Sequence, residues 1–248
     1  MKRFVFSDLD NTIVRHLSRV GQETFEVVGT DETGQANTVM TTSDLEFYQE
    51  ISRFGRLIPT TGRSMAAYGR LFGLQFESWV ILNHGATILT PDSSVDTVWL
   101  ERTTKIMSGL TTDLRRLYQH LQPLSHLLLE DCQYSNTIKL HLEHNLPLYI
   151  SVRASRTMPQ AHLEMLRQKI LEVLGLEPDF ELLHTGRITS VIPCLLNKKD
   201  AVLEVMARLG PTETLGVGDA LTDLPFMRLC DFQRAPENSE IQSAQWRI

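Results

Sequence analysis

Short apolar runs alternate with longer amphipathic stretches near the start of the chain, and this pattern predicts strands and helices in turn. The apolar side chains of residues 42–54 recur at near-helical spacing, and Gly55 follows them as a helix-terminating residue. A second helix is expected to run through Leu71 and to end near Gly73. The apolar runs that predict buried strands lie at residues 2–7, 56–59 and 79–82. Alternating strands and helices indicate a parallel sheet with right-handed crossovers.

From about residue 90 the pattern changes and predicts a different kind of unit. Residues 137–142 alternate between apolar and polar side chains, as in a half-buried strand. Helices are expected on either side of it, near residues 103–121 and 159–175, followed by a hairpin over residues 180–192. The first pattern then resumes with a helix at 199–209 and a strand at 214–217.

The predicted fold class is α/β, with a Rossmann-like parallel sheet core and an inserted α+β cap domain. We expect the core to comprise residues 1–89 and 189–248, and the cap domain to comprise residues 90–188. Residues 23–40 have the pattern of a β-hairpin around a turn-forming cluster that begins at Asp31. This hairpin follows the first strand directly, so it is expected either to form a flap over a pocket or to be an inert surface hairpin.

Composition excludes several classes of protein. The 248-residue chain is 42% hydrophobic and 22% charged, as is ordinary for a globular protein. Its net charge of −6 argues against a nucleic-acid-binding protein held by charge. There is no apolar run long enough for a membrane span and no signal-peptide pattern, so we expect a cytoplasmic protein without a membrane partner. The three cysteines are far apart and form no C-x-x-C motif, which favours reduced thiols: Cys132, Cys194 and Cys230.

Acidic side chains stand where the predicted parallel strands end. Asp8 and Asp10 follow the first strand, and Asp219 and Asp223 follow the strand at 214–217. The carboxyl ends of parallel strands meet at one edge of a sheet, so these carboxylates should converge there. Residues i and i+2 of an extended chain face the same side, and two carboxylates so placed repel unless a cation lies between them or one is protonated. Oxygen ligands without histidine or cysteine favour Mg²⁺, although a solvated strand end or a helix N-terminus would also accommodate the acids.

Two further segments offer groups that bind anions. Residues 61–64 open a helix after a strand, so Thr61, Gly62 and Arg63 could offer a hydroxyl and backbone N–H groups to a phosphate; an ordinary helix cap is the alternative. Lys198 begins another helix, where a cation opposes the helix dipole, and this favours a functional reason for the lysine. The neighbouring Lys199 is a competitor for the same role, and a solvated lysine remains the simplest alternative.

In this order, the motifs resemble those of the haloacid dehalogenase superfamily of phosphohydrolases. The resemblance rests on residues 8–12, residues 61–63, Lys198 and residues 218–223. The size and place of the inserted segment resemble the cap of the Cof-type, class IIB branch. Residues 186–202 are similar to the corresponding stretch of sucrose-phosphate phosphatases, and residues 84–86 to that of trehalose-phosphate phosphatases.

The resemblance implies a role for each motif residue. Asp8 would be the nucleophile that forms an aspartyl-phosphate, and Asp10 the general acid and base. Thr61 and Lys198 would hold the phosphoryl oxygens. Mg²⁺ would be bound by Asp8, by the backbone carbonyl of Asp10 and by Asp219, with Asp223 a ligand either directly or one layer further out.

The remaining expected substrate contacts are less specific. Gly62 and Arg63 belong to the phosphate-binding turn, and His84 could approach a phosphate or a sugar hydroxyl. Lys139 lies in an alternating strand similar to the sugar-contacting strand of sucrose-phosphate phosphatases, although a lysine there could simply be solvated.

The expected function is therefore a Mg²⁺-dependent phosphomonoester hydrolase acting on a small phosphorylated metabolite, a sugar phosphate first of all. The alternatives are a phosphosugar mutase, which usually carries a longer, glycine-rich acidic motif than residues 218–223, and a non-catalytic protein that binds a phosphometabolite. We expect a monomer or a homodimer.

Overall fold

The chain divides into two compact units that are joined by two crossings. The computed structural model describes residues 2–74, 76, 78–130, 132–175 and 177–245. The core unit comprises Met1–Leu100 and Asn197–Ile248, and the inserted unit comprises Glu101–Leu196. The expected domain boundaries, after residues 89 and 188, lie 11 and 8 residues before these two crossings and stay a prediction.

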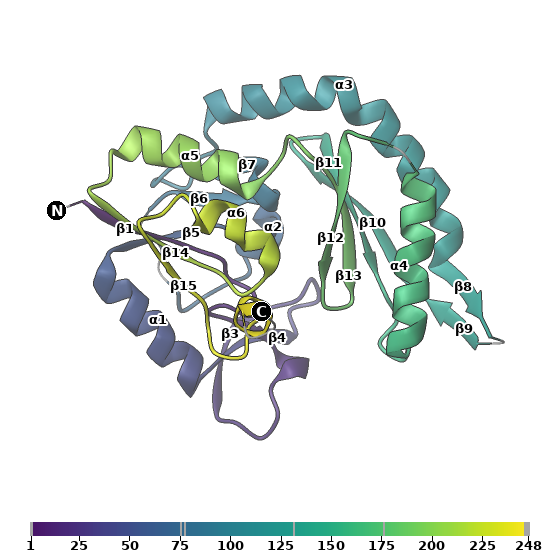
Figure 1. The fold of residues 1–248 in the computed structure, drawn as a ribbon, viewed down its shortest axis with the longest axis horizontal. Helices are drawn as coiled ribbons and strands as arrows, with labels where there is room; N and C mark the ends of the chain where they lie inside the picture. The colour runs from purple at the N-terminus through teal and green to yellow at the C-terminus, as the bar shows by residue number, and fades with distance from the viewer. Residues whose placement is uncertain (1, 75, 77, 131, 176, 246–248) are drawn as a thin grey trace. The chain divides into compact units, whose positions relative to one another are not determined.

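A four-stranded parallel sheet forms the centre of the described part of the core unit (Figure 1). Its strand order is β15-β14-β1-β5, so the first strand of the chain lies between one from the end of the sequence and one from its first quarter. The strands are β1 (Arg3–Ser7), β5 (Arg56–Pro59), β14 (Glu213–Val217) and β15 (Phe232–Arg234). The predicted parallel α/β core is confirmed.

Helices cover both faces of this sheet because the side chains of β1 alternate between two apolar clusters. Val5 packs in a cluster with Ile51 of α1 (Thr42–Phe54), whereas Phe6 packs in a cluster with Val202 of α5 (Lys198–Leu209). Figure 1 shows α1 and α5 on opposite sides of the sheet. A capping box between Thr41 and Asp44 begins α1, and Gly210 in the left-handed conformation ends α5. Three short helices complete the unit: α2 (Met65–Tyr68), α6 (Leu224–Met227) and α7 (Glu240–Gln245).

Two predictions for residues 65–82 differ from the structure. The helix expected through Leu71 ends at Tyr68, because the backbone N–H of Phe72 donates to Val28 O (2.9 Å) and Leu71 forms a bridge with Gly29. In the part of the chain that the structure describes, the third strand, β6 (Val80–Leu82), forms no more than a parallel bridge to this sheet, between Ile81 and Thr60. It pairs antiparallel with β7 (Thr87–Leu89) instead.

The predicted hairpin that follows β1 is present, and a short third strand joins it. The sheet order is β2-β4-β3, with β2 (Arg15–His16), β3 (Phe25–Thr30) and β4 (Ala36–Thr41). Val28 and Met40 belong to the apolar cluster under α1, and the guanidinium of Arg15 holds the carboxylate of Asp44 at 2.9 Å. The hairpin is therefore anchored in the core unit, while its role as a flap stays a prediction.

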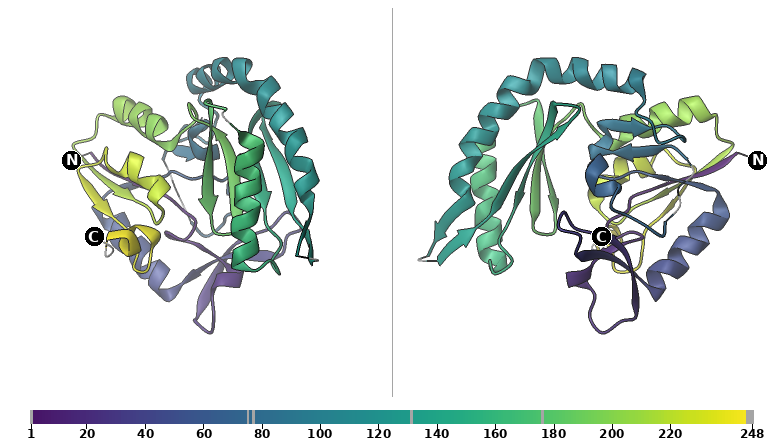
Figure 2. Two further views of the ribbon diagram at one scale, coloured as in Figure 1. Left: turned by 45° about the vertical axis from the view of Figure 1, so that its right-hand side comes forward. Right: turned by 180° about the vertical axis from the view of Figure 1, so that it is seen from behind.

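The inserted unit is an antiparallel α+β structure. Its main sheet has the order β10-β11-β13-β12, and Figures 1 and 2 show α4 and the C-terminal part of α3 along one face of it. The sequence reading missed β11, whose Leu148, Ile150 and Val152 are buried. The elements are α3 (Thr97–Leu121), β8 (His126–Leu129), β9 (Cys132–Ser135), β10 (Thr137–Glu143), β11 (Leu146–Arg153), α4 (Gln160–Leu174), β12 (Phe180–Thr185) and β13 (Ile188–Pro193).

Single 3₁₀ turns connect several of these elements. They are η1 (Leu17–Arg19), η2 (Asn83–Gly85), η3 (Gln122–Ser125) and η4 (Leu221–Asp223). Among the helices that the structure describes, none has both the length and the apolar character that crossing a bilayer requires.

Candidate active site

Hydrogen bonds that continue the parallel ladder fix the first residue beyond each strand. The N–H of Asp8 donates to Val217 O (2.9 Å), and the N–H of Thr60 donates to Ser7 O (2.7 Å). Thr61 follows and donates its N–H to Ile81 O (2.9 Å). The carboxyl ends of β1, β5 and β14 therefore meet at one edge, as the strand-end argument predicted.

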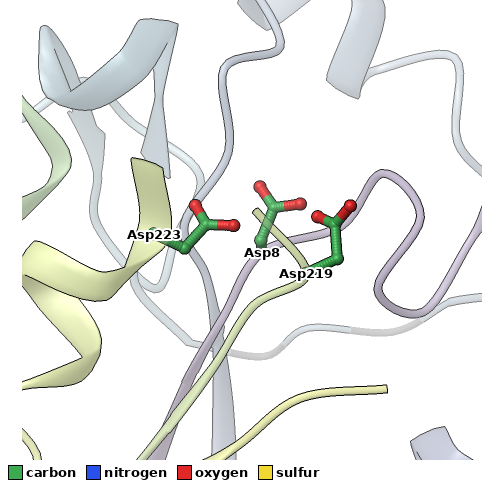
Figure 3. A group of neighbouring side chains, drawn as sticks. All are labelled: Asp8, Asp219 and Asp223. Carbon is green, nitrogen blue, oxygen red and sulfur yellow. The ribbon is translucent and has the colours of Figure 1, made fainter. Parts of the chain in front are cut away.

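Three carboxylates converge at this edge. One oxygen from each of Asp8, Asp219 and Asp223 lies within 4.8 Å of the other two (Figure 3). Asp8 and Asp223 are buried, and the hydroxyl of Thr12 lies 3.4 Å from Asp8 Oδ2 and 3.3 Å from Asp219 Oδ1. Thr12 was not among the predicted site residues, although its hydroxyl, four residues after Asp8, was a signal in the sequence.

The turn that carries Asp223 closes tightly on the end of β14. A Cβ added to Gly218 would lie 2.5 Å from the Cβ of Asp223, so only glycine lets the chain fold back this far. The N–H of Ala220 donates to Asp223 Oδ2 (3.3 Å). The other oxygen of Asp223, Oδ1, accepts from the ammonium of Lys198. Thr222 at the same turn is exposed.

Lys198 places a cation in this cluster. Its Nζ lies 2.6 Å from Asp8 Oδ1 and 2.7 Å from Asp223 Oδ1, whereas the side chain of Lys199 is exposed. The side chain of Asn197 accepts from the N–H of Asp200 (2.9 Å) and begins α5, which places Lys198 at the sheet edge. Of the two candidate lysines, the geometry selects Lys198.

One lysine does not neutralise three carboxylates. Burial raises the pKa of Asp8 well above its ordinary value, and the charges of Asp223 and Asp219 add to this effect while Lys198 opposes it. Burial and the charge of Asp223 raise the pKa of Asp219 to about 6. Burial alone would lower the pKa of Lys198, but the two carboxylates raise it, so the lysine stays charged. The cluster therefore carries surplus negative charge at neutral pH.

The donor set fits a hard divalent cation. Carboxylate oxygens are the ligands that Mg²⁺ prefers, and a cation placed among them would offset the burial and the repulsion that together raise the pKa values of Asp8 and Asp219. Asp8, Asp219 and Asp223 are the residues whose oxygens are close enough to share one ion. The backbone carbonyl of Asp10 as a further ligand stays a prediction.

Asp10 has a different partner from the other acids. Arg63 binds its carboxylate with two hydrogen bonds, from Nε to Oδ2 (2.8 Å) and from Nη2 to Oδ1 (2.6 Å). Burial alone would raise the pKa of Asp10, but the charge and hydrogen bonds of Arg63 hold it below its ordinary value. The Asp10 side chain is 43% exposed, so a substrate could reach it. Arg63 was expected on the substrate, and it contacts Asp10 here.

The turn at residues 61–63 is rigid and is tied to a second turn. Thr61 is buried, and its hydroxyl accepts from the N–H of Arg63 (3.2 Å). The N–H of His84 donates to Thr61 O (3.2 Å), and that of Asn83 donates to Arg63 O (2.8 Å). Helix α2 begins just beyond the turn, where the hydroxyl of Ser64 accepts from the N–H of Ala67 (3.2 Å).

The second turn, η2 (Asn83–Gly85), has an unusual backbone. Asn83, His84 and Gly85 all have positive φ angles of 52°, 57° and 102°. Each of the two non-glycine residues costs about 1–3 kcal/mol in this conformation, so the surrounding structure must hold them there. This backbone conformation was not predicted; Asn before a His-Gly pair was a weak signal for the turn.

Lys139 lies in β10 of the inserted unit, opposite Ser151 of β11, and its side chain is exposed. It belongs to a different unit from the other expected site residues, so its contact with a substrate stays a prediction.

Comparison with known proteins shows the fold. No family model matches the sequence, and no curated protein matches it significantly. The structure is similar to the sucrose-phosphatase from Synechocystis sp. PCC6803 in complex with sucrose and phosphate, with a TM-score of 0.58 and 19% identity over 99% of this chain and 87% of that one. It is also similar to the C-terminal domain of Candida albicans trehalose-6-phosphate phosphatase, with a TM-score of 0.60 and 14% identity over 92% of this chain and 73% of that one. A trehalose-6-phosphate phosphatase related protein gives a TM-score of 0.54 at 16% identity, over 96% and 87%. The predicted resemblance to Cof-type haloacid dehalogenase phosphatases is confirmed at the level of the fold.

Proposed function

We propose that the protein is a Mg²⁺-dependent phosphomonoester hydrolase that acts on a small phosphorylated metabolite, in the first place a sugar phosphate. The observation that carries this proposal is the buried Asp8 carboxylate, which shares Lys198 with Asp223 and lies within reach of Asp219. Three carboxylates lie close together at this sheet edge, and only one lysine contacts them among the described residues. Such a cluster can accept a divalent cation together with the negatively charged phosphoryl group of a substrate.

In this proposal Asp8 is the nucleophile. A carboxylate oxygen of Asp8 forms a bond to phosphorus while the bond from phosphorus to the sugar oxygen breaks, which gives an aspartyl-phosphate and an alcohol. Water then attacks the same phosphorus, the bond to Asp8 breaks, and inorganic phosphate leaves. Asp10 gives the proton to the departing alcohol and takes one from the attacking water. Arg63 holds the ionised Asp10 carboxylate, which is the form that takes a proton from water. Giving a proton to the alcohol requires a protonated Asp10, and protonation weakens the contact with Arg63.

The remaining groups hold the phosphoryl oxygens. Lys198 offers an ammonium that already lies at Asp8, and Thr61 offers a hydroxyl on a turn tied to the neighbouring strand. Phosphoryl transfer depends mainly on such positioning and charge neutralisation. Mg²⁺, held by Asp8, Asp219 and Asp223, would screen the negative nucleophile from the negative phosphate.

The substrate class is supported by the fold neighbours. One of them is described as a sucrose-phosphatase with bound sucrose and phosphate, and two carry trehalose-6-phosphate phosphatase in their names. These proteins share a fold with this chain at low identity, so sugar phosphates are the first compounds to test rather than the only ones.

The experiment is phosphate release from a panel of sugar phosphates and other phosphomonoesters, with Mg²⁺ or with EDTA. Wild type is compared with Asp8→Asn and with Asp113→Asn, a matched change of a partly exposed aspartate on α3. The expected result is Mg²⁺-dependent turnover that is lost in Asp8→Asn and kept in Asp113→Asn. Turnover that survives Asp8→Asn would overturn the mechanism, and phosphate binding without turnover on any compound would favour a non-catalytic binding protein.

A further inference from the structure

The imidazole of His84 lies directly against Gly62. A Cβ added to Gly62 would lie 2.3 Å from Cε1, 2.7 Å from Nε2 and 2.9 Å from Nδ1 of the ring, so the ring fills the space where a side chain at position 62 would be. The φ angle of Gly62 is outside the left-handed range, so the backbone itself would accept any residue there. Glycine at position 62 is therefore required by the ring of His84 and not by the backbone.

The turn that carries His84 also contacts the lysine loop. A Cβ added to Gly85 would lie 2.2 Å from Asn197 O and 2.9 Å from the backbone nitrogen of Lys198. The indole N–H of Trp99 donates to Gly85 O (2.9 Å), and the side-chain amide of Asn83 donates to Thr87 Oγ1 (3.0 Å). The Asn83–Gly85 turn is thus held from both sides and lies between the turn at residues 61–63 and the start of α5.

We propose that His84 is a positioning residue, whose ring fixes the turn at residues 61–63 relative to Lys198. The inference rests on the proposed function, because that turn and Lys198 are there assigned to the phosphoryl oxygens. Backbone hydrogen bonds join the two turns at Thr61 O and Arg63 O, and the ring closes the remaining space over the residue between them. His84 acts through Gly62 on Thr61 and Arg63.

The consequence is a specific kinetic effect. Groups that neutralise a transferring phosphoryl group contribute most when charge develops in the transition state, and a displacement of about 1 Å can cost roughly 10²-fold in rate. Loosening the turn should therefore lower kcat much more than it raises KM.

The test is a double-mutant cycle of His84→Gly and Gly62→Ala. Glycine at position 84 keeps the left-handed backbone without strain, and alanine at 62 is excluded only by the ring. Each single variant is expected to lower kcat by about 10- to 100-fold with KM changed less than about threefold. In the double variant the alanine methyl occupies part of the space that the ring has left, so kcat should recover to within about tenfold of wild type.

Controls separate this inference from the proposed function. Gly109→Ala, in α3 where an added Cβ meets nothing within 4 Å, should leave turnover unchanged. Thermal unfolding and binding of inorganic phosphate in the presence of Mg²⁺ are measured on every variant. Two results would overturn the role of His84 and leave the proposed function standing, provided that the wild type turns over substrate. One is a kcat of His84→Gly equal to that of wild type. The other is a kcat of the double variant that equals the product of the two single effects. If no substrate turned over, phosphate binding that weakens by no more than about threefold in each single variant and recovers in the double variant would still support the role of His84.

Discussion

Two carboxylates only two residues apart, Asp8 and Asp10, have opposite electrostatic surroundings. Asp8 is buried, shares one lysine with Asp223, and has a raised pKa because burial and neighbouring carboxylates both disfavour its charge. Asp10 is partly exposed, accepts two hydrogen bonds from Arg63, and has a pKa below its ordinary value. Strand β1 ends at Ser7, before both aspartates, and the chain turns at Asn11, whose φ of 61° is in the left-handed region.

The difference shows how one sheet edge supports two kinds of acid. The region around Asp8 has more carboxylates than cations, so a bound metal ion would be needed to balance its charge. The region around Asp10 is neutralised by Arg63 from within the same unit. The proposed nucleophile must be ionised and the proposed donor protonated, whereas each environment on its own favours the opposite form. A cation beside Asp8 and a weaker Arg63 contact at Asp10 are therefore part of the proposed reaction, and the four predictions below test the contrast between the two regions.

Removing Lys198, the cation that contacts Asp8 and Asp223, should have the largest effect. Lys198→Met leaves Asp8 and Asp223 facing each other without a counter-charge, so kcat/KM is expected to fall about 10³-fold, as for loss of a main electrostatic stabiliser. Steady-state kinetics on the best substrate measure this effect. Lys199→Met, next to it and exposed, is the matched control and should be near wild type; a loss of less than tenfold in Lys198→Met would contradict the assignment.

Removing the cation of the Asp10 region should have a smaller effect with a pH signature. In Arg63→Met the group that lowers the pKa of Asp10 is gone, so this pKa rises and the limb of the pH–kcat profile that reports Asp10 moves to higher pH. We expect kcat to fall about 10- to 100-fold because Asp10 also loses its orientation.

Two matched variants check this prediction. Arg63→Lys keeps the charge but not the two-point contact and should be intermediate. Arg53→Met, an exposed change on α1, should not move the profile. A pH profile of Arg63→Met that superimposes on that of wild type would argue against Asp10 as the proton donor.

The surplus charge of the Asp8 region should also appear in stability. Burial and Asp223 raise the pKa of Asp219 to about 6 from an ordinary value near 3.8, so the folded chain binds a proton more tightly than the unfolded chain. This contribution is fully present below about pH 4 and is lost as the pH rises through about 6. In EDTA, the part of Tm that depends on Asp219 should therefore decrease as the pH rises from about 4 to above 6.

Mg²⁺ should reverse the trend. Its ligands must be ionised, so the ion should raise Tm more at pH 7.5 than at pH 5, with each kcal/mol of binding worth about 2–4 °C. Asp219→Asn should flatten the pH dependence in EDTA and weaken the effect of Mg²⁺. An equal rise in Tm at both pH values would mean that the ion binds elsewhere.

The smallest expected effect comes from the hydroxyl that lies between the acids. Thr12 is within hydrogen-bonding distance of both Asp8 and Asp219, and both contacts are long. Thr12→Val should lower kcat/KM and the affinity for Mg²⁺ by about 2- to 10-fold, the worth of one such bond. Thr12→Ser, which keeps the hydroxyl, should recover most of the loss, and equal defects in the two variants would point to packing instead.

Much of this architecture could be predicted because the core obeys local rules. The helix at residues 42–54 has a capping box and a regular apolar face, and the strand-end rule brings Asp8, Asp219 and Asp223 together without any knowledge of their contacts. The inserted unit was predicted less well. Strand β11 was missed, and Pro147 at its start interrupts the β-strand pattern; tertiary pairing with β10 and β13 defines the strand.

The parts of the site that could not be predicted depend on contacts between distant segments. Arg63 was expected on a phosphate, and nothing in its surroundings in sequence shows that Asp10, 53 residues earlier, accepts both of its hydrogen bonds. The turn at Asn83–Gly85 has positive φ angles at Asn83 and His84, and neither residue type predicts this conformation from the sequence. Helix α2 stops early because residues 71 and 72 pair with the hairpin, an interaction that no helical propensity reveals.

The strand order of the core sheet has a consequence during protein synthesis. β1 lies between β5, which is made soon after it, and β14, which is made near the end, and Lys198 is 190 residues after Asp8. At roughly 5–20 residues per second, a ribosome needs about 10 to 40 s to supply that lysine. For this time a nascent chain has one edge of β1 without its partner and the first two aspartates without the segments that complete the cluster. The inserted unit is translated in full during the same interval, so the complete acid cluster is one of the last features that a newly made molecule acquires.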